Sequence, residues 1–336
     1  MKIVSLPGAA LLLALLFALW RPSAEAQAKK TAAPNSDLVT FYSLAAADAR
    51  VVIAAGKPGV IARSTDAGAT WNLSFHPGGT GGDLYGVEFA DSLHGVVVGE
   101  KGTILRTSDA GSTWERSTGG TGQNLVGVHF ANPSTGWICG FEGTILGTAD
   151  GGNTWSAQPS GVRSNLWSVS SSDPANCWVV GGSGTVLRSS NGGKSWAAES
   201  SGIQQFLYST AFIDRMTGWA VGGYGAILKT TDGGESWSKQ HLKRYLSVFE
   251  SKAFHYSVHA FDRNSGLLAG TGGTMLVTHD GGETWSQAKT GSDAVLFAVG
   301  FANRQTGWAA GTLGTILKTT DGGKTWKRSY GRKSTR

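Results

Sequence analysis

A phrase of eight residues occurs seven times along this chain of 336 residues, and it constrains the fold more than any other feature. Each copy is a polar turn that runs into a tryptophan, as in TSDAGSTW at 107–114 and TTDGGKTW at 319–326. Successive tryptophans are separated by 43, 41, 41, 41, 48 and 41 residues, and such a period marks a repeat architecture. The turn residues are Asp66, Asp109, Asp150, Asn191, Asp232, Asp280 and Asp321, and the tryptophans are Trp71, Trp114, Trp155, Trp196, Trp237, Trp285 and Trp326.

Each repeat also contains three short apolar runs before the turn and one run after it. Ahead of Asp109 these are LYGVEFAD, HGVVVGE and GTILRT, and TWERS follows. Short runs rich in Val, Ile, Trp and Phe and bounded by Gly, Asp and Ser are typical of strands. Four strands in about 40 residues make one propeller blade. The sequence therefore predicts an all-β fold, a seven-bladed β-propeller with four antiparallel strands per blade, over residues 38–329.

Composition agrees with one large repeat domain. The chain is 40% hydrophobic and contains 13 Trp and 13 Phe, which is enough to fill the spaces between blades and excludes disordered and fibrous classes. The first repeat begins with FYSLAAAD and is already complete, so the pattern leaves the closure of the ring open. Residues Asp37 to Thr40 could add an extra strand to the last blade.

The N-terminal residues differ in composition from the repeats. Lys2 precedes an apolar stretch at 9–20, and the small-residue site Ala24-Glu25-Ala26 follows it. This pattern predicts a secretory signal peptide at 1–26, a flexible leader at 27–37, and export to the periplasm or the medium. A membrane anchor is the alternative, but 12 apolar residues are too few to span about 30 Å of hydrocarbon.

Cysteine and histidine give no sign of a metal or cofactor. For an exported protein Cys139 and Cys177 raise the question of a disulfide, but they belong to neighbouring repeats at registers three apart, so we expect two buried free thiols. Among the seven histidines only His255 and His259 lie close together, on one face of a strand, and a pair does not complete a tetrahedral site. We treat these histidines as ordinary surface residues.

Positive charge gathers at the C-terminus. Without residues 1–26 the chain has 27 basic and 22 acidic residues, and KRSYGRKSTR at 327–336 alone contributes the excess. The body of the protein is thus near neutral, which argues against nucleic-acid binding. The tail at 330–336 is either a solvated end or a contact for anionic lipid or an acidic partner.

A second basic feature lies within the repeats. The residue three positions before the turn Asp or Asn is cationic in five copies and is Gly147 or Val277 in the other two. Equal register on the third strand would carry these cations to one rim. They either pack their stems between blades or steer an acidic partner, and the two roles are compatible. The candidate partner-binding residues are Arg63, Arg106, Arg188, Lys229 and Lys318.

One repeat is longer than the rest. The spacing of 48 residues before Trp285 reflects an insertion around QHLKRYLSVFESKAFHYS at 240–257. Insertions in repeat proteins lie in loops, often on the binding face, and aromatic residues with Arg suit a protein interface. Arg244 and Tyr245 are therefore candidate partner-binding residues, unless the segment is a loop that packs on its own repeat.

The repeated turn resembles a known pattern. Asp or Asn accepts hydrogen bonds from the backbone downstream, Gly supplies a left-handed conformation, and Trp covers the turn. The form S/T-x-D-x-G-x-T/S-W is similar to the Asp box of bacterial neuraminidase-type repeats. That resemblance implies a turn between the third and fourth strands of a blade. The box is structural and does not indicate a chemistry.

Two longer stretches narrow the resemblance. TGWAVGGYGAILKTTDGGESW at 217–237 and TGWAAGTLGTILKTTDGGKTW at 306–326 resemble the repeat of the photosystem II stability and assembly factor family, exported seven-bladed propellers of the thylakoid lumen. The resemblance implies a monomeric, non-catalytic protein that binds membrane-protein subunits, with surface arginines in the contact. In this chain the resemblance can be carried over only to the five cations that lie three positions before the turn Asp or Asn.

The rival class is a secreted carbohydrate-binding or glycoside-hydrolysing propeller, because sialidases share the Asp box. Hydrolysis generally needs two carboxylates about 5 to 9.5 Å apart. The arginine motif near the start of sialidases is missing. Acids that recur between the first and second runs indicate turn chemistry rather than a unique catalytic pair; these are Asp48, Asp91, Asp173 and Asp262. We therefore expect no enzyme, and a pair of converging acids beside an aromatic platform would count against this expectation.

Overall fold

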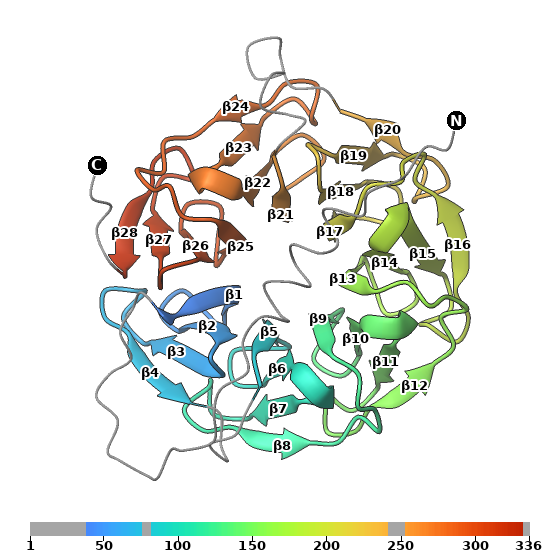
Figure 1. Ribbon diagram of the computed structural model, residues 1–336, viewed down its shortest axis with the longest axis horizontal. Coiled ribbons are helices and arrows are strands. Elements are labelled where there is room, and N and C mark those ends of the chain that lie inside the picture. Colours follow the sequence, from blue (N-terminus) through green and yellow to red (C-terminus); the bar gives the residue numbers. More distant parts are fainter. Residues whose placement is uncertain (1–37, 76–81, 241–252, 332–336) are drawn as a thin grey trace, which may run out of the picture. The chain divides into compact units, whose positions relative to one another are not determined.

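The computed structural model describes residues 38–75, 82–240 and 253–331. They belong to one unit, Asn35–Arg336. Its strands form seven four-stranded antiparallel sheets that follow one another around a ring (Figure 1). The prediction of a seven-bladed all-β propeller is confirmed.

Each blade uses one continuous stretch of chain, and its strands run outward in sequence order from the centre of the ring. Blades 1 to 4 consist of β1 Thr40–Ala46, β2 Val52–Lys57, β3 Val60–Ser64, β4 Asn72–Phe75; β5 Leu84–Phe89, β6 Gly95–Gly99, β7 Ile104–Thr107, β8 Glu115–Ser117; β9 Leu125–Phe130, β10 Gly136–Gly140, β11 Ile145–Thr148, β12 Ser156–Gln158; β13 Leu166–Ser171, β14 Cys177–Gly181, β15 Thr185–Ser189 and β16 Ala197–Ser200. Blades 5 to 7 consist of β17 Leu207–Phe212, β18 Gly218–Gly222, β19 Ile227–Thr230, β20 Ser238–Lys239; β21 His255–Ala260, β22 Gly266–Gly270, β23 Met275–Thr278, β24 Ser286–Gln287; β25 Leu296–Phe301, β26 Gly307–Gly311, β27 Ile316–Thr319 and β28 Lys327–Tyr330.

Burial explains the composition of the strands. The second strand of blades 2 to 7 is buried at all five positions, because a neighbouring blade packs against each of its faces. The sequences of these strands are therefore continuous apolar runs of Val, Trp, Leu and Ala rather than an alternation of apolar and polar residues. The outermost strands, such as β8 and β12, are mostly exposed and correspondingly polar.

The first strand of every blade contains a β-bulge at the same position. The pairing register skips one residue near the strand's start, which adds twist and turns that residue out of the ladder. The skipped residues are Tyr42, Tyr85, Val126, Trp167, Tyr208, Tyr256 and Phe297.

The ring closes by side-chain packing between blades 1 and 7. The last blade has four strands, and none comes from residues 38–40, so the extra strand that the sequence left open does not form. Instead β1 contacts both β5 and β25, and Trp308 lies in one apolar cluster with Phe41. The Trp71 indole also donates to the Ser329 hydroxyl at 2.9 Å across this seam.

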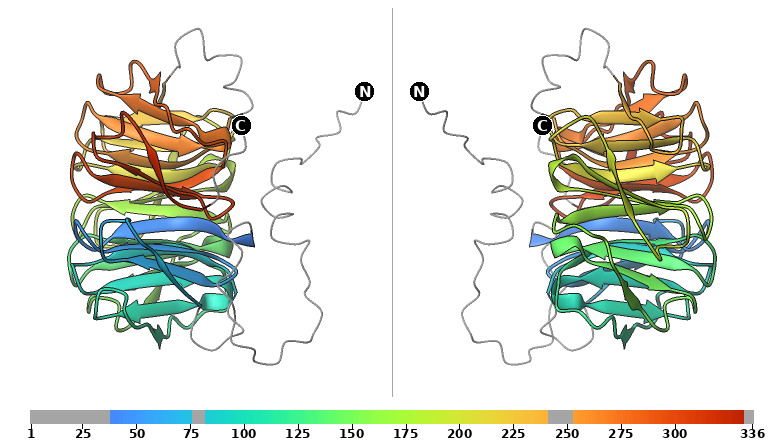
Figure 2. Two further views of the ribbon diagram at one scale, coloured as in Figure 1. Left: turned by 90° about the vertical axis from the view of Figure 1, so that its left-hand side faces the viewer. Right: turned by 90° about the vertical axis from the view of Figure 1, so that its right-hand side faces the viewer.

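Antiparallel strands give the ring two different faces. One face carries, in each blade, the loop between the first and second strands and the Asp box between the third and fourth strands. We call it the Asp-box face. The other carries the turns between second and third strands and the connections between blades, and we call it the aromatic face. Four short 3-10 helices lie on this second face: η2 Glu100–Gly102, η3 Phe141–Gly143, η4 Gly182–Gly184 and η5 Thr271–Gly273. Figure 2 shows one of them at the edge of its blade.

The burial of the cysteine and histidine side chains tests what the sequence predicted for them. Cys139 and Cys177 are buried free thiols in one apolar cluster, as expected. The assignment of the histidines to the surface is wrong for His255, whose side chain is buried. The bulge at Tyr256 breaks the strand alternation, so His255 is buried while His259 packs on aromatic rings, and the two do not share a face.

Candidate protein-binding surfaces

The Asp boxes are closed networks of hydrogen bonds. In blade 2 the Thr107 hydroxyl donates to Asp109 Oδ1 at 2.8 Å and accepts from the Gly111 N–H at 2.9 Å. Asp109 also accepts from the N–H and the hydroxyl of Thr113 at 2.8 and 2.6 Å. The same bonds recur in the other five Asp copies. In blade 4 Asn191 Oδ1 accepts from the Ser195 N–H at 3.0 Å, and Asn191 Nδ2 donates to the Ser195 hydroxyl at 2.8 Å. Each carboxylate is therefore occupied by its own turn, as the pattern predicted.

The boxes also join neighbouring blades. The residue after each box Asp or Asn has a positive φ, which turns its carbonyl toward the preceding blade. In three copies this carbonyl accepts a hydrogen bond from a second-strand tryptophan: Trp178 Nε1 donates to Gly233 O at 2.7 Å, Trp308 Nε1 to Ala67 O at 3.3 Å and Trp137 Nε1 to Gly192 O at 3.4 Å. The box is thus both a turn and a contact between blades.

The third-strand cations take part in these contacts. Arg63 Nε donates to Ala110 O at 2.9 Å, and Lys229 Nζ donates to Gly281 O at 2.6 Å while lying 5.0 Å from the Trp219 ring centroid. Burial lowers the pKa of Lys229 below its usual value. Arg188 pairs with Glu235 of the next box at 3.1 Å. The remaining two also stay close to their strands, with Arg106 4.0 Å from Glu115 and Lys318 over Trp308.

Two blades have no cation at this position, and other side chains pack there instead. In blade 3 the side chain of Gln158 covers Gly147 and donates to Gly192 O of the next box at 3.2 Å. In blade 6 Val277 is buried in the apolar cluster between blades. Contacts between blades thus account for this position in five blades, whereas Arg106 and Lys318 contact residues of their own blades. A role of the five cations in partner binding stays a prediction.

A row of ion pairs crosses the Asp-box face between blades 4 and 7. In blades 5, 6 and 7 the arginine in the loop between the first and second strands reaches the Asp of the preceding blade's loop: Arg215 to Asp173 at 2.8 Å, Arg263 to Asp214 at 2.7 Å, and Arg304 to Asp262 at 2.7 Å. The same acids also bind the backbone of their own loops, which fits the turn role inferred for Asp173 and Asp262. Sequence analysis missed the arginines, although Asp-Arg at 214–215 and 262–263 was a visible signal.

Aromatic side chains gather on the opposite face. The rings of six bulge residues lie at the inner end of their blades and contact one another, with centroids 5.6 Å apart for Tyr42 and Tyr85, 5.4 Å for Tyr42 and Phe297, and 4.8 Å for Phe297 and Tyr256. The row continues through Tyr208 to Trp167. This row was not predicted, although the sequence has an aromatic residue at the second position of the unit in six of seven repeats.

The aromatic row widens at blades 5 and 6. Phe254 contacts Tyr208, Tyr224 and Tyr256, and Phe206 stacks on Tyr208 with an interplanar angle of 6°. Tyr224 is 45% exposed and has a φ of 56°, a conformation that costs a bulky residue energy.

Two acids lie beside the aromatic row at blade 2. The Tyr85 hydroxyl donates to Glu100 Oε1 at 3.0 Å, and the Glu100 N–H donates to the Asp83 carbonyl at 3.0 Å. Burial, with a further contribution from the Glu100 carboxylate, raises the pKa of Asp83 to about 6, and Lys57 opposes the shift. A pair of acids beside an aromatic platform is the feature that would count against a purely non-catalytic protein.

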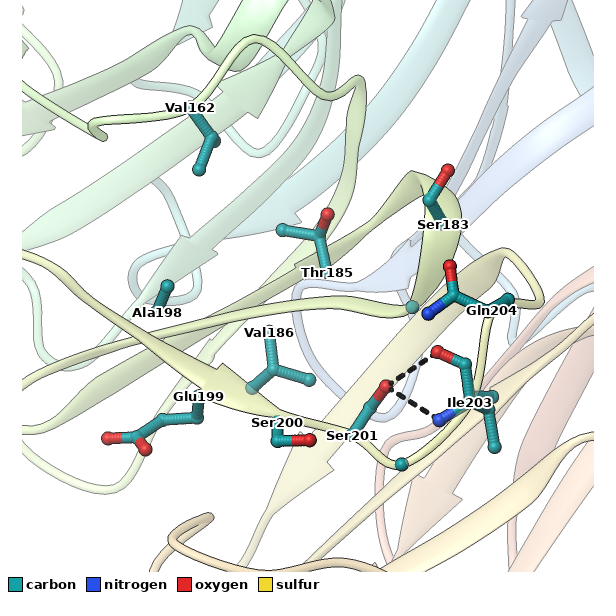
Figure 3. A pocket seen from close by; sticks show the side chains of 12 residues that line it. Val162, Ser183, Thr185, Val186, Ala198, Glu199, Ser200, Ser201, Ile203 and Gln204 are labelled. Carbon is teal, nitrogen blue, oxygen red and sulfur yellow. Dashed lines mark hydrogen bonds between the residues drawn. The ribbon is translucent and has the colours of Figure 1, made fainter.

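A shallow cavity of about 280 Å³ lies at the outer edge of blade 4 (Figure 3). It is lined mainly by β15, β16 and the connection that follows, and Ser201 in that connection accepts from the Ile203 N–H at 3.4 Å. Its one carboxylate, Glu199, points away from the other labelled side chains in Figure 3. The lining therefore offers no group of converging acids or bases.

Some predictions fall outside the described residues. These include Arg244 and Tyr245, the signal peptide at 1–26, the leader up to residue 37, and the tail beyond Gly331. In the described ranges no three His, Cys, Asp or Glu side chains form a metal-binding group. Within the same ranges no helix is long and apolar enough to cross a membrane.

Comparison with known folds agrees with the architecture. A structure described as YCF48 bound to D1 peptide superposes with a TM-score of 0.69 at 20% identity, covering 84% of this chain and 92% of that one. YCF48 from Cyanidioschyzon merolae gives 0.66 at 19% identity over 85% and 97%. A GH74 xyloglucanase from Xanthomonas campestris gives 0.67 at 12% identity, over 87% of this chain and 55% of that chain. At these identities the matches establish the propeller fold alone.

Comparison with protein-family models shows which family the chain belongs to. No curated protein matches this sequence significantly. The family model described as Photosynthesis system II assembly factor YCF48 matches residues 107–198 and 201–291, which together exceed half of the chain. The resemblance inferred from 217–237 and 306–326 is thereby confirmed, and this chain belongs to the YCF48 family of photosystem II assembly factors.

Proposed function

We propose that this protein is a non-catalytic scaffold that binds subunits of a membrane or periplasmic complex through one face of its propeller and assists their assembly. Family membership carries the proposal, and the D1 peptide in the structure of a similar YCF48 supports a protein as the partner. The predicted signal peptide supports a place of action in the periplasm, or in the thylakoid lumen if the source is photosynthetic. We further propose that the scaffold acts as a monomer without metal or cofactor.

The test is capture of partners by the tagged protein from gently solubilised native membranes, read by mass spectrometry. Two variants assign the face: Tyr224→Ser on the aromatic face, and Arg106→Gln with Arg188→Gln on the third-strand register. Specific membrane subunits that co-purify with the wild type and are lost in one variant would support the proposal and assign its face. Recovery of nothing above background by the wild type would overturn it. Equal melting temperatures for all proteins are the control.

A carbohydrate-binding or hydrolysing propeller remains the second candidate, because Asp83 and Glu100 lie next to Tyr85 and Tyr42. Hydrolysis of soluble β-glucan oligosaccharides that is abolished in Glu100→Gln would favour it. The absence of both hydrolysis and binding would leave the scaffold role alone.

A further inference from the structure

The residue that precedes each first strand divides the aromatic face into two halves. In blades 2 to 4 this residue is polar, namely Asp83, Asn124 and Asn165, and in blades 5 to 7 it is apolar, namely Phe206, Phe254 and Val295. The aromatic row joins the halves, since Tyr42, Phe297 and Tyr256 connect Tyr85 to Phe254. One face therefore presents an apolar end and a polar end on a continuous aromatic platform.

The apolar end is a surface rather than a core. Tyr224 is 45% exposed, and Phe254, which contacts it, is partly exposed as well. The corresponding turn of blade 7 holds Leu313, 50% exposed with a φ of 55°, and Gly314 beside it donates to the Val39 carbonyl at 2.8 Å. The left-handed conformation belongs to this turn in general, since Lys101 and Glu142 adopt it in blades 2 and 3. What distinguishes Tyr224 and Leu313 is a large exposed apolar side chain, and neighbouring exposed apolar side chains favour contact with another molecule.

The polar end is acidic. The first residue of the 3-10 turn is Glu100 in blade 2, where blade 3 has Phe141 and blade 4 has Gly182. Asp83 adds a second carboxylate, and Lys57 is the one cation that acts on it. Tyr42, which is half-buried, and Tyr85, which is buried beneath it, lie beside both acids, and a tyrosine face next to carboxylates favours an ammonium or guanidinium group.

We propose that the aromatic face binds an extended protein segment whose apolar side chains lie on Tyr224 and Phe254 and whose lysine or arginine lies at Asp83 and Glu100. The proposal rests on the proposed function and names the chemistry of its partner. Charge complementarity selects the occupant: the acid pair would repel an anionic lipid surface, and it would attract a cationic peptide.

Fluorescence anisotropy with synthetic peptides tests the proposal. The probe is a capped peptide of alternating Leu and Ser with one lysine near an end, and its matched control carries norleucine in place of lysine. We expect the protein to bind the lysine peptide about tenfold more tightly at pH 7.5. Asp83→Asn with Glu100→Gln should remove this preference and leave binding of the norleucine peptide unchanged, whereas Tyr224→Ser should weaken both peptides.

Matched variants separate a binding effect from a folding effect. Asparagine stands at the position of Asp83 in the next two blades, so Asp83→Asn should fold normally. Glu142→Gln removes an exposed acid from the neighbouring turn, and Leu93→Ser removes an exposed apolar residue from the Asp-box face. Both control variants should bind like the wild type.

Three outcomes would overturn the inference: equal affinity for the two peptides, no binding of either, or oligosaccharide binding that is lost in the Asp83 and Glu100 variant. If that variant still captures membrane subunits, the scaffold function survives and this site is wrong. If the wild type captures nothing, the scaffold function itself fails.

Discussion

The two faces of the propeller use their polar groups in opposite ways. On the Asp-box face many charges have a partner within the chain: box carboxylates bind their own turns, and Arg215, Arg263 and Arg304 reach acids of the preceding blade. On the aromatic face several rings lie partly exposed, and the turn residues Tyr224 and Leu313 are large, apolar and exposed. The comparison teaches that the conspicuous repeat motif holds the ring together, while the less regular residues on the other face form the surface for which we propose a binding role.

The largest expected effect comes from the contacts between blades. Trp178 is fully buried, stacks on Phe212 at 3.6 Å between centroids, and donates to the next Asp box. Trp178→Ala should lower the free energy of unfolding by about 3–5 kcal/mol, because it leaves a cavity. Tyr224→Ser should change it by less than about 0.5 kcal/mol. Urea denaturation checks both, and similar losses for the two variants would contradict the division between the faces.

Acid should weaken blade 6 because of the buried imidazole of His255. Five other blades have Leu where blade 6 has His255, and neither ring nitrogen of His255 has a hydrogen-bond partner among the described residues. Burial lowers the pKa of His255 to about 4. The unfolded chain binds this proton more readily, so stability is complete above about pH 6.5 and falls between pH 6.5 and 4.

The corresponding variant is His255→Leu. From pH 7.5 to 4.5 the wild type should lose roughly 2–3 kcal/mol of unfolding free energy through this group, and the variant should lack this part of the loss. Burial also lowers the pKa of His259 to about 4, and its contribution should remain in both proteins. His279→Gln, on the exposed box of the same blade, is the control and should behave like the wild type. A loss of the same size in His255→Leu would show that other groups carry the acid sensitivity.

A single Asp box should matter less than a buried tryptophan. Asp232→Ala removes the acceptor of the Ser236 N–H, the Ser236 hydroxyl and the Thr230 hydroxyl, and should cost about 1–2 kcal/mol. The bond from the Ser236 hydroxyl lowers the pKa of Asp232 to about 2, so its contribution is lost only as pH falls below about 4. Asn191→Asp, which restores the common residue, should stay within about 0.5 kcal/mol. Thermal melts at pH 7 and pH 5 should show equal differences, and a cost that vanishes at pH 5 would contradict this account.

The smallest effect should come from the ion-pair row. Arg263 is 68% exposed, and solvent screens its pair with Asp214. Arg263→Gln should cost about 0–1 kcal/mol at low salt and nothing measurable in 1 M NaCl. A loss that persists at high salt would show that the row contributes through packing rather than charge.

The regular features of the fold could be predicted from the sequence, and the irregular ones could not. Seven boxes with a period of about 41 residues determine blade number and strand order, since each box must lie between a third and a fourth strand. The bulges are invisible to a pattern of alternation, and they bring the side chains of Tyr85 and Tyr256 onto one face. Asp83 and Glu100 lie 17 residues apart and become neighbours only through the pairing of β5 with β6.

The cations of the third strand show the opposite case. Their common register was correctly read from the sequence, yet a register does not reveal what a long side chain contacts. Lys229 bonds the carbonyl of Gly281 in the next blade, and Gln158 makes the same kind of bond from a different strand in blade 3. A bond to the next box recurs in six blades and the residue type that supplies it varies, whereas in blade 6 Val277 packs in an apolar cluster.

Ring closure without strand exchange has a consequence for how such a protein can change. Every blade comes from one uninterrupted stretch and carries its own Asp box, and in six of the seven blades the described residues include a side chain that hydrogen-bonds the next box. The seam between blades 1 and 7 shares the indole-to-carbonyl bond with the seam between blades 4 and 5. A gene that copies or deletes one repeat would thus supply a unit whose two sides already fit its neighbours, and the size of the ring is limited only by the angle between blades.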